Sequence, residues 1–259
     1  MPLAEAAGIP LHYRTDGVRS SPCLVLSNSL GTDLSMWDAQ ASRLAADFFV
    51  VRYDTRGHGK SGNGVGPASI DDLGNDVLAL LDHLDIRKAS FCGISMGGLT
   101  GQWLGIHAPA RITRLVLANT AAKIGNADGW TTRAAHVRAT GLDAIADGAP
   151  SRWFTPAFIA SAPETVARMV ATLRAQDAQG YANCCDALAH ADLRTDVGSI
   201  VAPTLIVAGA DDPVTTVGDG EWLRDHIRGA SLAIVPASHI SSIEAEEEFT
   251  RAVRDFLLG

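Results

Sequence analysis

The sequence predicts an α/β protein with a doubly wound, mostly parallel central sheet, flanking helices and an inserted helical cap. Short apolar runs recur along the chain, and helical patterns separate most of them, as in repeated βαβ units. The runs are continuous rather than alternating, which is typical of strands covered on both faces of a parallel sheet. The expected strands cover residues 24–26, 48–53, 89–92, 115–117, 205–207 and 232–235.

Two segments between and after these strands have a clear helical period. In residues 69–84 the apolar side chains form one stripe, and Ser69 is the expected N-cap. Residues 243–258 repeat the pattern and predict a closing helix. At the N-terminus we expect an antiparallel hairpin through His12 and Gly17.

One interval breaks the alternation of strands and helices. Between Asn119 and Thr204 lie about 80 residues without a convincing strand, far more than the roughly 10–15 residues of an ordinary helical crossover. A helical insertion explains this length. We therefore expect a core made of residues 1–120 and 201–259, with a helical cap at residues 121–200.

Composition and charge limit the partners of the protein. Of the 259 residues, 47% are hydrophobic and 19% are charged, which is typical of a globular protein. The formal net charge is -8 and no stretch is dense in Lys and Arg, so we expect no nucleic-acid ligand. No apolar run approaches the roughly 18–20 residues that a membrane span needs. The oligomeric state stays open.

The cysteines and the N-terminal segment indicate a cytoplasmic protein. The four cysteines show no C-x-x-C spacing, and two of them lie in expected strands, which favours reduced, packed thiols. The N-terminal residues lack the basic region and apolar run of a signal peptide.

The segment SFCGISMGGLT, residues 90–100, places one serine among glycines directly after an expected strand. Residues 93–97, GISMG, fit the pattern G-x-S-x-G between a strand and a helix, where it forms a sharp turn that exposes the serine. Glycine is needed two residues before and after Ser95, because side chains there would collide in so tight a turn. Taken alone, the pattern is equally compatible with a βα turn whose glycines only serve packing.

A nucleophilic serine needs a base and an orienting carboxylate, in the chain order Ser, Asp, His for this kind of turn. Asp211 and Asp212 follow one late strand, and His239 follows the last. Of the eight histidines, only His239 lies between a late strand and the final helix, whereas His58, for example, is expected to be structural or solvated. These residues alone do not separate Asp211 from Asp212, since only one of two adjacent carboxylates can meet the imidazole.

Two backbone N–H groups are candidates for binding a developing oxyanion. The Met96 N–H follows the serine at a helix N-terminus, where the helix dipole favours negative charge. A second donor is expected in the loop after an earlier strand, which begins near Ser27 and points to the Leu30 N–H.

Other kinds of site have little support in the sequence. Residues 56–61, RGHGKS, resemble the end of a phosphate-binding loop, but Asp54 stands where the first glycine is required, so we expect a turn that braces the sheet. Metal-binding and dinucleotide motifs are lacking, and we expect no cofactor. The acidic run at residues 244–248 is expected to be a solvated first turn of a helix.

Five segments together resemble the α/β-hydrolase family over essentially the whole chain. They are SNSLGTDLSMWD (27–38), YDTRGHGKSG (53–62), FCGISMGGLTGQWLG (91–105), PTLIVAGADDPVT (203–215) and PASHISSIEAEEEF (236–249). Members of the family usually place the acid fourth in a G-x-x-D segment, and the resemblance therefore implies Asp212.

Within that family, the chain is similar to the 3-oxoadipate enol-lactonases of the β-ketoadipate pathway, in its protocatechuate branch. The similarity lies in SNSLGTDLSMW, in Asp-x-Arg-Gly-His-Gly-x-Ser, and in WTTRAAHV (130–137), RWFTPAF (152–158) and GYANCCDAL (180–188). The common His-Gly of the oxyanion loop is Asn28-Ser29 here, as in these lactonases, and the usual Gly before the histidine is Ser238. Neither departure removes a catalytic atom.

The resemblance implies cofactor-free hydrolysis of a small anionic lactone by a Ser-His-Asp triad. A cation in the cap is then expected to bind the substrate carboxylate, and we choose Arg133, with Trp130 nearby and Trp153 as an apolar wall. The same fold and triad also serve cofactor-free haloperoxidases, perhydrolases and general carboxylesterases. A more distant alternative is a ligand receptor that keeps the triad.

Overall fold

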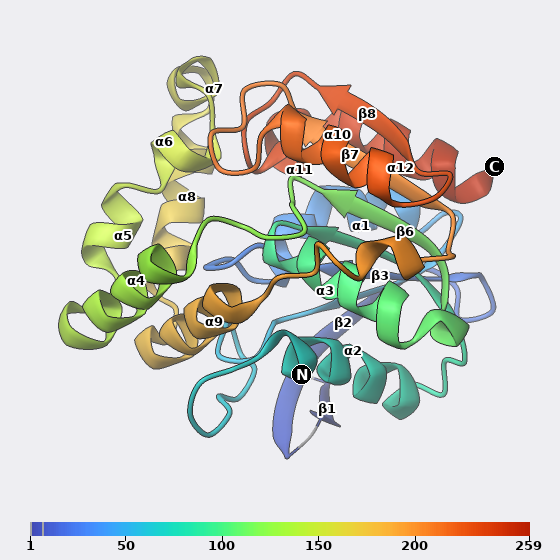
Figure 1. Cartoon of the computed structure of the whole chain (residues 1–259), viewed down its shortest axis with the longest axis horizontal. Coiled ribbons are helices and arrows are strands. Elements are labelled where there is room, and N and C mark those ends of the chain that lie inside the picture. Colours follow the sequence, from blue (N-terminus) through green and yellow to red (C-terminus); the bar gives the residue numbers. More distant parts are fainter. Residues whose placement is uncertain (1, 7) are drawn as a thin grey trace.

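The computed structural model describes residues 2–6 and 8–259, in which eight strands form one twisted sheet (Figure 1). The strand order is β1-β2-β4-β3-β5-β6-β7-β8. The pairs β1–β2 and β2–β4 are antiparallel and the other neighbours are parallel, which confirms the predicted fold class. The strands are β1 Leu3–Ala6, β2 Ile9–Asp16, β3 Cys23–Ser27, β4 Phe49–Tyr53, β5 Ala89–Ile94, β6 Ile112–Ala118, β7 Thr204–Gly209 and β8 Ser231–Val235.

The N-terminal hairpin is present, but its turn differs from the prediction. It is formed by β1 and β2, with Gly8 at a φ of 82° in the connection. Gly17 instead follows the end of β2. The strand continues through Asp16 because it also pairs with β4, where Asp16 lies opposite Val50.

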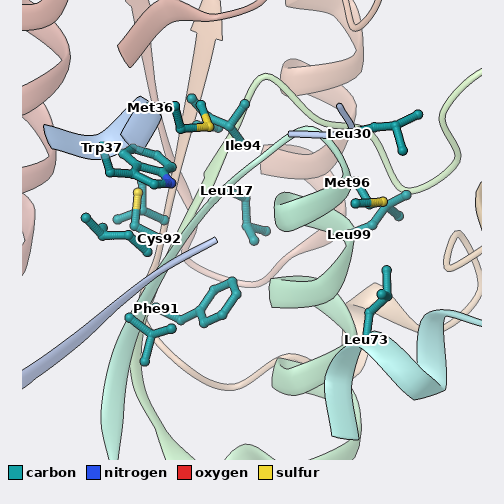
Figure 2. Packing of buried hydrophobic residues seen from close by; sticks show 14 of the residues in the cluster. Leu30, Met36, Trp37, Leu73, Phe91, Cys92, Ile94, Met96, Leu99 and Leu117 are labelled. Carbon is teal, nitrogen blue, oxygen red and sulfur yellow. The ribbon is translucent and has the colours of Figure 1, made fainter. Parts of the chain in front are cut away.

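The continuous apolar runs are strands with both faces covered. Every residue of β5 and β7 is buried, as expected for central parallel strands. Successive side chains point to opposite faces, so the Phe91 ring is directed toward α3, Met96–His107, while Cys92 lies near Trp37 (Figure 2). A Cβ on Gly101 of α3 would lie 3.0 Å from the Phe91 ring, so the helix approaches the sheet closely.

Helices cover both faces of the sheet. On one face α2 packs against α3, with α10 over β7 and β8, and α1 and α12 contact each other on the opposite face. The core helices are α1 Asp38–Leu44, α2 Ile70–His83, α3, α10 Val217–His226, α11 Ser241–Glu244 and α12 Glu246–Leu258. Short 3₁₀ turns are η1 Leu34–Trp37, η2 Pro109–Arg111 and η3 Val197–Ser199.

The two helices predicted by periodicity have different outcomes. Helix α2 begins as expected, with Ser69 as N-cap in a capping box completed by Asp72. The closing helix predicted at residues 243–258 is in fact two helices, α11 and α12, separated at Ala245. The acidic turn is divided as well, since Glu246 to Glu248 begin α12 while Glu244 ends α11 and turns inward.

The interval between β6 and β7 contains six α-helices among the described residues, followed by η3. They are α4 Ala127–Thr140, α5 Asp143–Asp147, α6 Pro150–Trp153, α7 Pro156–Ser161, α8 Pro163–Arg174 and α9 Ala178–His190. Helices α4 and α9 pack together, and a Cβ on Gly180 of α9 would lie 2.4 Å from the Gly57 backbone. This close approach fixes α9 against the loop after β4.

The loop after β4 braces the sheet, as predicted for the segment that resembles a phosphate-binding loop. The Asp54 carboxylate accepts hydrogen bonds from the Leu34 N–H at 2.8 Å and the Lys60 N–H at 2.9 Å, and it pairs with the His12 ring at 2.7 Å. Arg56 forms two 2.7 Å bonds with the Asp76 carboxylate of α2. The loop therefore joins β2, η1 and α2.

Candidate active site

The turn between β5 and α3 holds Ser95 in a strained conformation. Ser95 has a φ of 57° and a ψ of -114°, which non-glycine residues adopt only where the surroundings impose it. A Cβ at Gly93 would lie 2.1 Å from the Gly97 carbonyl oxygen, and a Cβ at Gly97 would lie 2.4 Å from that of Ser27. Both glycines are therefore required by contact, and Ser95, although buried, stands at the tip of the turn and lines a cavity.

The imidazole of His239 is paired with Asp212. Its Nδ1 lies 2.9 Å and 3.1 Å from the two oxygens of the Asp212 carboxylate, and both side chains are buried. Asp211 is exposed instead. The backbone explains this difference, because the Asp211 N–H bonds to the Ala237 carbonyl oxygen at 3.0 Å and thereby fixes how the two loops meet.

The Asp212 carboxylate has several further donors. It accepts from the N–H groups of Val214 and Thr215, from the Thr215 hydroxyl at 2.8 Å and from the Asn119 side-chain amide at 2.9 Å. Burial alone would raise the pKa of Asp212. The hydrogen bond and charge of His239 lower it, and hydrogen bonds from Asn119 and Thr215 lower it further, so that together they outweigh the effect of burial. The pKa of Asp212 therefore lies below its ordinary value, and the group is an anion at neutral pH.

The loop after β3 is held rigidly beside Ser95. The Asn28 side chain donates to the Tyr53 carbonyl at 2.8 Å and accepts from the Trp37 indole at 3.0 Å, and the Asn28 carbonyl accepts from the Gly97 N–H at 3.1 Å. Asn28 is thus a structural residue that ties the loop to the serine turn. Leu30, two residues later, lines the same cavity as Ser95.

His58 supports this loop through a hydrogen bond to the Gly31 backbone. Its Nε2 lies 3.0 Å from the Gly31 N–H and must accept that hydrogen bond, so its Nδ1 carries the proton that is donated to the Arg56 carbonyl at 3.1 Å. Burial lowers the pKa of His58, which keeps the ring neutral and suited to this role. His58 was predicted to be structural or solvated, and it is a buried structural residue.

A cavity of about 310 Å³ joins the serine turn to the helices between β6 and β7. Ser95, His239 and Leu30 line its floor, while Trp130, Arg133 and Trp153 come from the helical interval. These six predicted residues therefore share one cavity, whereas Asp212 lies outside its lining, behind His239. Met96 is buried beside Ser95 as the first residue of α3, where a helix leaves its backbone N–H without an intrahelical partner.

Two further residues of this cavity, Arg152 and Tyr181, were not predicted. Arg133 lies over the Trp130 ring, 4.7 Å from its centre, and lines the cavity together with Tyr181. Burial raises the pKa of Tyr181 to about 12, and the nearby Arg133 and Arg152 charges only partly offset this. Burial also lowers the pKa of Arg152, and the charge of Arg133 adds to this effect.

The positive charge of Arg133 and Arg152 is not neutralised by protein carboxylates. The salt bridges of the helical interval instead involve Lys123, Arg138, Arg174 and Arg194, and in the described part of the chain neither cavity guanidinium forms one. Two guanidinium groups in a cavity without a carboxylate partner provide a site for an anionic group of a ligand.

The family comparison agrees with this geometry. A family model described as the alpha/beta hydrolase fold matches residues 22–246. The chain belongs to the α/β-hydrolase family. In residues 2–6 and 8–259, no group of three or more His, Cys, Asp or Glu side chains is arranged to hold a metal ion, and no helix is long and apolar enough to cross a membrane.

Several curated and solved members of the family are similar to this α/β hydrolase over more than nine-tenths of their length. 3-Oxoadipate enol-lactonase 2 of Acinetobacter baylyi is 53% identical over 96% of this chain and 93% of its own. 3-Oxoadipate enol-lactonase 1 of the same organism is 45% identical over 98% and 96%. The crystal structure of the enol-lactonase from Burkholderia xenovorans LB400 is 45% identical, with a TM-score of 0.98 and 100% of both chains covered.

Sequence reasoning missed Arg152 and Tyr181 of this hydrolase for a physical reason. Arg152 lies on α6, a four-residue helix that begins at Pro150 and has no periodicity to detect. Tyr181 lies on α9, whose face toward the cavity is defined only by packing against α4. The one available signal was that Arg152 directly precedes the predicted wall residue Trp153.

Proposed function

We propose that this α/β hydrolase opens 3-oxoadipate enol-lactone to 3-oxoadipate, a step of the β-ketoadipate pathway, using Ser95, His239 and Asp212. The observation that carries the proposal is a cavity in which a strained serine and a paired histidine share walls with two unneutralised guanidinium groups. An ester-cleaving centre beside a cationic site suits a lactone that carries a free carboxylate. The two curated relatives with this activity support the same substrate.

In the proposed acylation step, His239 accepts the Ser95 proton while the Ser95 Oγ attacks the lactone carbonyl. Asp212 holds the Nδ1–H of the ring and stabilises the imidazolium that forms, which fits an Asp212 pKa below its ordinary value. The negative charge on the former carbonyl oxygen is stabilised by two N–H groups. One is that of Leu30 in the loop after β3, and the other is that of Met96 at the N-terminus of α3.

Collapse of the tetrahedral intermediate breaks the bond between the acyl carbon and the ring oxygen. The ring opens without losing an atom. The enolate that leaves is protonated at carbon and becomes a ketone, and its proton replaces the one that the His239 imidazolium took from Ser95 and now gives up, so His239 is neutral again before the next step. This leaving group requires little acid assistance. A water molecule that gives a proton to His239 then attacks the acyl-enzyme, and Ser95 regains its proton as the dicarboxylate is released.

We assign the recognition of the substrate carboxylate to Arg133 together with Arg152. Each guanidinium is partly buried, where a charge-assisted hydrogen bond to a carboxylate is stronger than in water. Trp130 orients Arg133 through its ring face, and Trp153 adds an apolar wall. Residues 121–200 are accordingly proposed to act as the cap of the enzyme, since these four side chains all come from that interval. Its cytoplasmic location stays a prediction.

The decisive experiment compares two substrates. The purified protein is assayed for kcat/KM on 3-oxoadipate enol-lactone and on a neutral p-nitrophenyl ester under the same conditions. We expect a large preference for the lactone, and we expect Ser95→Ala to abolish both activities. Equal activity on both substrates would favour a general carboxylesterase, and halide-dependent peroxide chemistry without lactone turnover would favour a haloperoxidase. Binding without multiple turnovers would favour a receptor.

A further inference from the structure

The Glu244 carboxylate joins the loop that carries His239 to the start of α7. It accepts a 2.9 Å hydrogen bond from the Ser238 N–H, on the residue directly before His239. It also accepts from the Thr155 N–H, at 3.1 Å and 3.3 Å to its two oxygens, and from the Thr155 hydroxyl. One half-buried carboxylate thus binds Ser238, 6 positions before it, and Thr155, 89 positions before it.

A second contact joins the same two segments on the other side of the histidine. The Ile240 N–H donates to the Trp153 carbonyl oxygen at 3.0 Å. The residues immediately before and after His239 are therefore both attached to residues 153–155. Figure 1 shows α6 and α7 beside the C-terminal part of the chain, in agreement with these bonds.

Both joined segments contribute to the active-site cavity. His239 lies on one of them, and Arg152 and Trp153 lie on the other. Thr155 adds rigidity, because its hydroxyl accepts from the Phe158 N–H as the N-cap of α7 while donating to Glu244. A displacement of either segment would alter the position of the histidine relative to the cationic wall of the cavity.

We propose that Glu244 is a positioning residue that fixes the His239 loop to the 152–155 segment, so that the catalytic base and the substrate-carboxylate site keep one relative position. The inference rests on the proposed function, which assigns roles to His239 and Arg152. Glu244 does not touch the reacting atoms. It acts through Ser238 on the histidine and through Thr155 on the cavity wall.

The contact requires a carboxylate. Three donors converge on Glu244, and only an ionised carboxylate presents acceptors to all of them. In Glu244→Gln the side chain keeps its shape, but its NH₂ group must face either the Ser238 N–H or the Thr155 donors. That variant therefore breaks one side of the contact without creating a large cavity.

The test measures kcat and KM for Glu244→Gln, Thr155→Val and the double variant, on the lactone and on p-nitrophenyl acetate. Rates are normalised to active sites titrated with a p-nitrophenyl phosphonate, which removes the effect of misfolded protein. Matched controls are Glu248→Gln, an exposed acid of α12, and Thr155→Ser, which keeps the hydroxyl. Both controls are expected to behave as wild type.

For Glu244→Gln we expect kcat per active site to fall on both substrates, on the order of 10- to 100-fold, because the base is displaced. For Thr155→Val we expect kcat/KM on the lactone to fall about 3- to 10-fold while acetate turnover stays within about two-fold, because the cavity wall moves more than the base. The double variant should be no worse than Glu244→Gln, since both changes break one contact.

Wild-type kinetics per active site in Glu244→Gln, or additive effects in the double variant, would overturn the proposal. If Glu244→Gln does not fold, Thr155→Val decides, and an unchanged ratio of lactone to acetate activity overturns it. Failure of the proposed function is a separate outcome. The wild type would then hydrolyse the acetate but not the lactone, and the effect of Glu244→Gln on acetate turnover would still test the positioning role.

Discussion

The Asp212 carboxylate accepts hydrogen bonds from several groups besides the His239 imidazole. Bonds from Asn119 and Thr215 fix its carboxylate before substrate arrives, and they hold the pKa of Asp212 below its ordinary value. Preorganisation of this kind removes the need for the carboxylate to rotate when the imidazolium forms. The adjacent Asp211 is exposed and lacks this environment.

Substitution of these two aspartates should therefore have very different effects. In Asp212→Asn the amide cannot accept the His239 Nδ1–H as a carboxylate does and favours the wrong tautomer, so kcat should fall on the order of 10³- to 10⁴-fold. In Asp211→Asn we expect kcat within about two-fold of wild type. Steady-state kinetics on a p-nitrophenyl ester measure both. A comparable loss in Asp211→Asn would contradict the assignment.

A buried histidine that supports the loop after β3 makes stability depend on pH. The pKa of His58 is lowered in the folded protein, so between its unfolded value near 6.5 and its lower folded value the unfolded chain binds more protons. Stability from this group is complete above about pH 6.5 and decreases as the pH falls through that window. Protonation would also set an Nε2–H against the Gly31 N–H.

We expect urea unfolding to show a greater loss of stability between pH 7.5 and pH 5.5 for the wild type than for His58→Gln. The glutamine carbonyl can accept from the Gly31 N–H but does not titrate. The comparison uses the change with pH in each protein, so a uniform destabilisation of the variant does not matter. Equal changes in the two proteins would show that His58 does not contribute.

At the scale of elements, the serine turn depends on the close approach of three backbones. A Cβ at Gly97 would lie 2.4 Å from the carbonyl oxygen of Ser27 at the end of β3, which is backbone and cannot rotate away. Gly97→Ala should therefore push α3 from the sheet and lower the free energy of unfolding by about 2–4 kcal/mol. Chemical denaturation measures this change.

The control for this substitution is Gly218→Ala in α10. A Cβ there would meet only the Thr216 hydroxyl at 3.5 Å, an ordinary contact, and its φ is not positive. Because alanine reduces the freedom of the unfolded chain, we expect no loss and a gain of up to about 1 kcal/mol. Equal losses at the two positions would show that the contact at the turn is not responsible.

The elements that sequence patterns predicted well are those whose burial repeats along the chain. The strands of the parallel sheet appear as continuous apolar runs because both of their faces are covered, and α2 shows both a stripe and its Ser69 cap. The break between α11 and α12 was not predictable in this way. It lies at Ala245, next to Glu244, whose carboxylate bonds to Ser238 and Thr155, and such distant contacts leave no periodic signal.

The site residues also divide into those that sequence patterns predict and those that depend on tertiary packing. Ser95, Asp212 and His239 stand directly after strands, where the topology brings them to one edge of the sheet, so their proximity can be inferred from order alone. The choice of Asp212 needed the family pattern. Arg152 and Glu244 belong to short helices whose position depends on tertiary packing, and neither was assigned a role from the sequence.

At the scale of the whole molecule, the local charge of the cavity opposes the charge of the protein. The formal net charge is -8, whereas Arg133 and Arg152 place two cations in the cavity beside Ser95. An anionic substrate is therefore repelled by most of the surface and attracted only at short range. Selectivity for such a substrate should depend on these two residues rather than on the overall field.

We expect Arg133→Gln and Arg152→Gln each to raise KM for the anionic lactone about 10- to 100-fold, as expected for the loss of a charge-assisted hydrogen bond. The neutral ester should be hydrolysed with nearly unchanged kcat/KM by both variants, because the triad is intact.

Arg168→Gln removes the same charge from the exposed side of α8, outside this cavity, and serves as the control for net charge. If Arg168→Gln raised KM for the lactone as much as the cavity variants, the overall field and not the cavity would select the substrate. If the two cavity variants affected the ester and the lactone equally, their role would be structural, and the carboxylate of the substrate would be bound elsewhere.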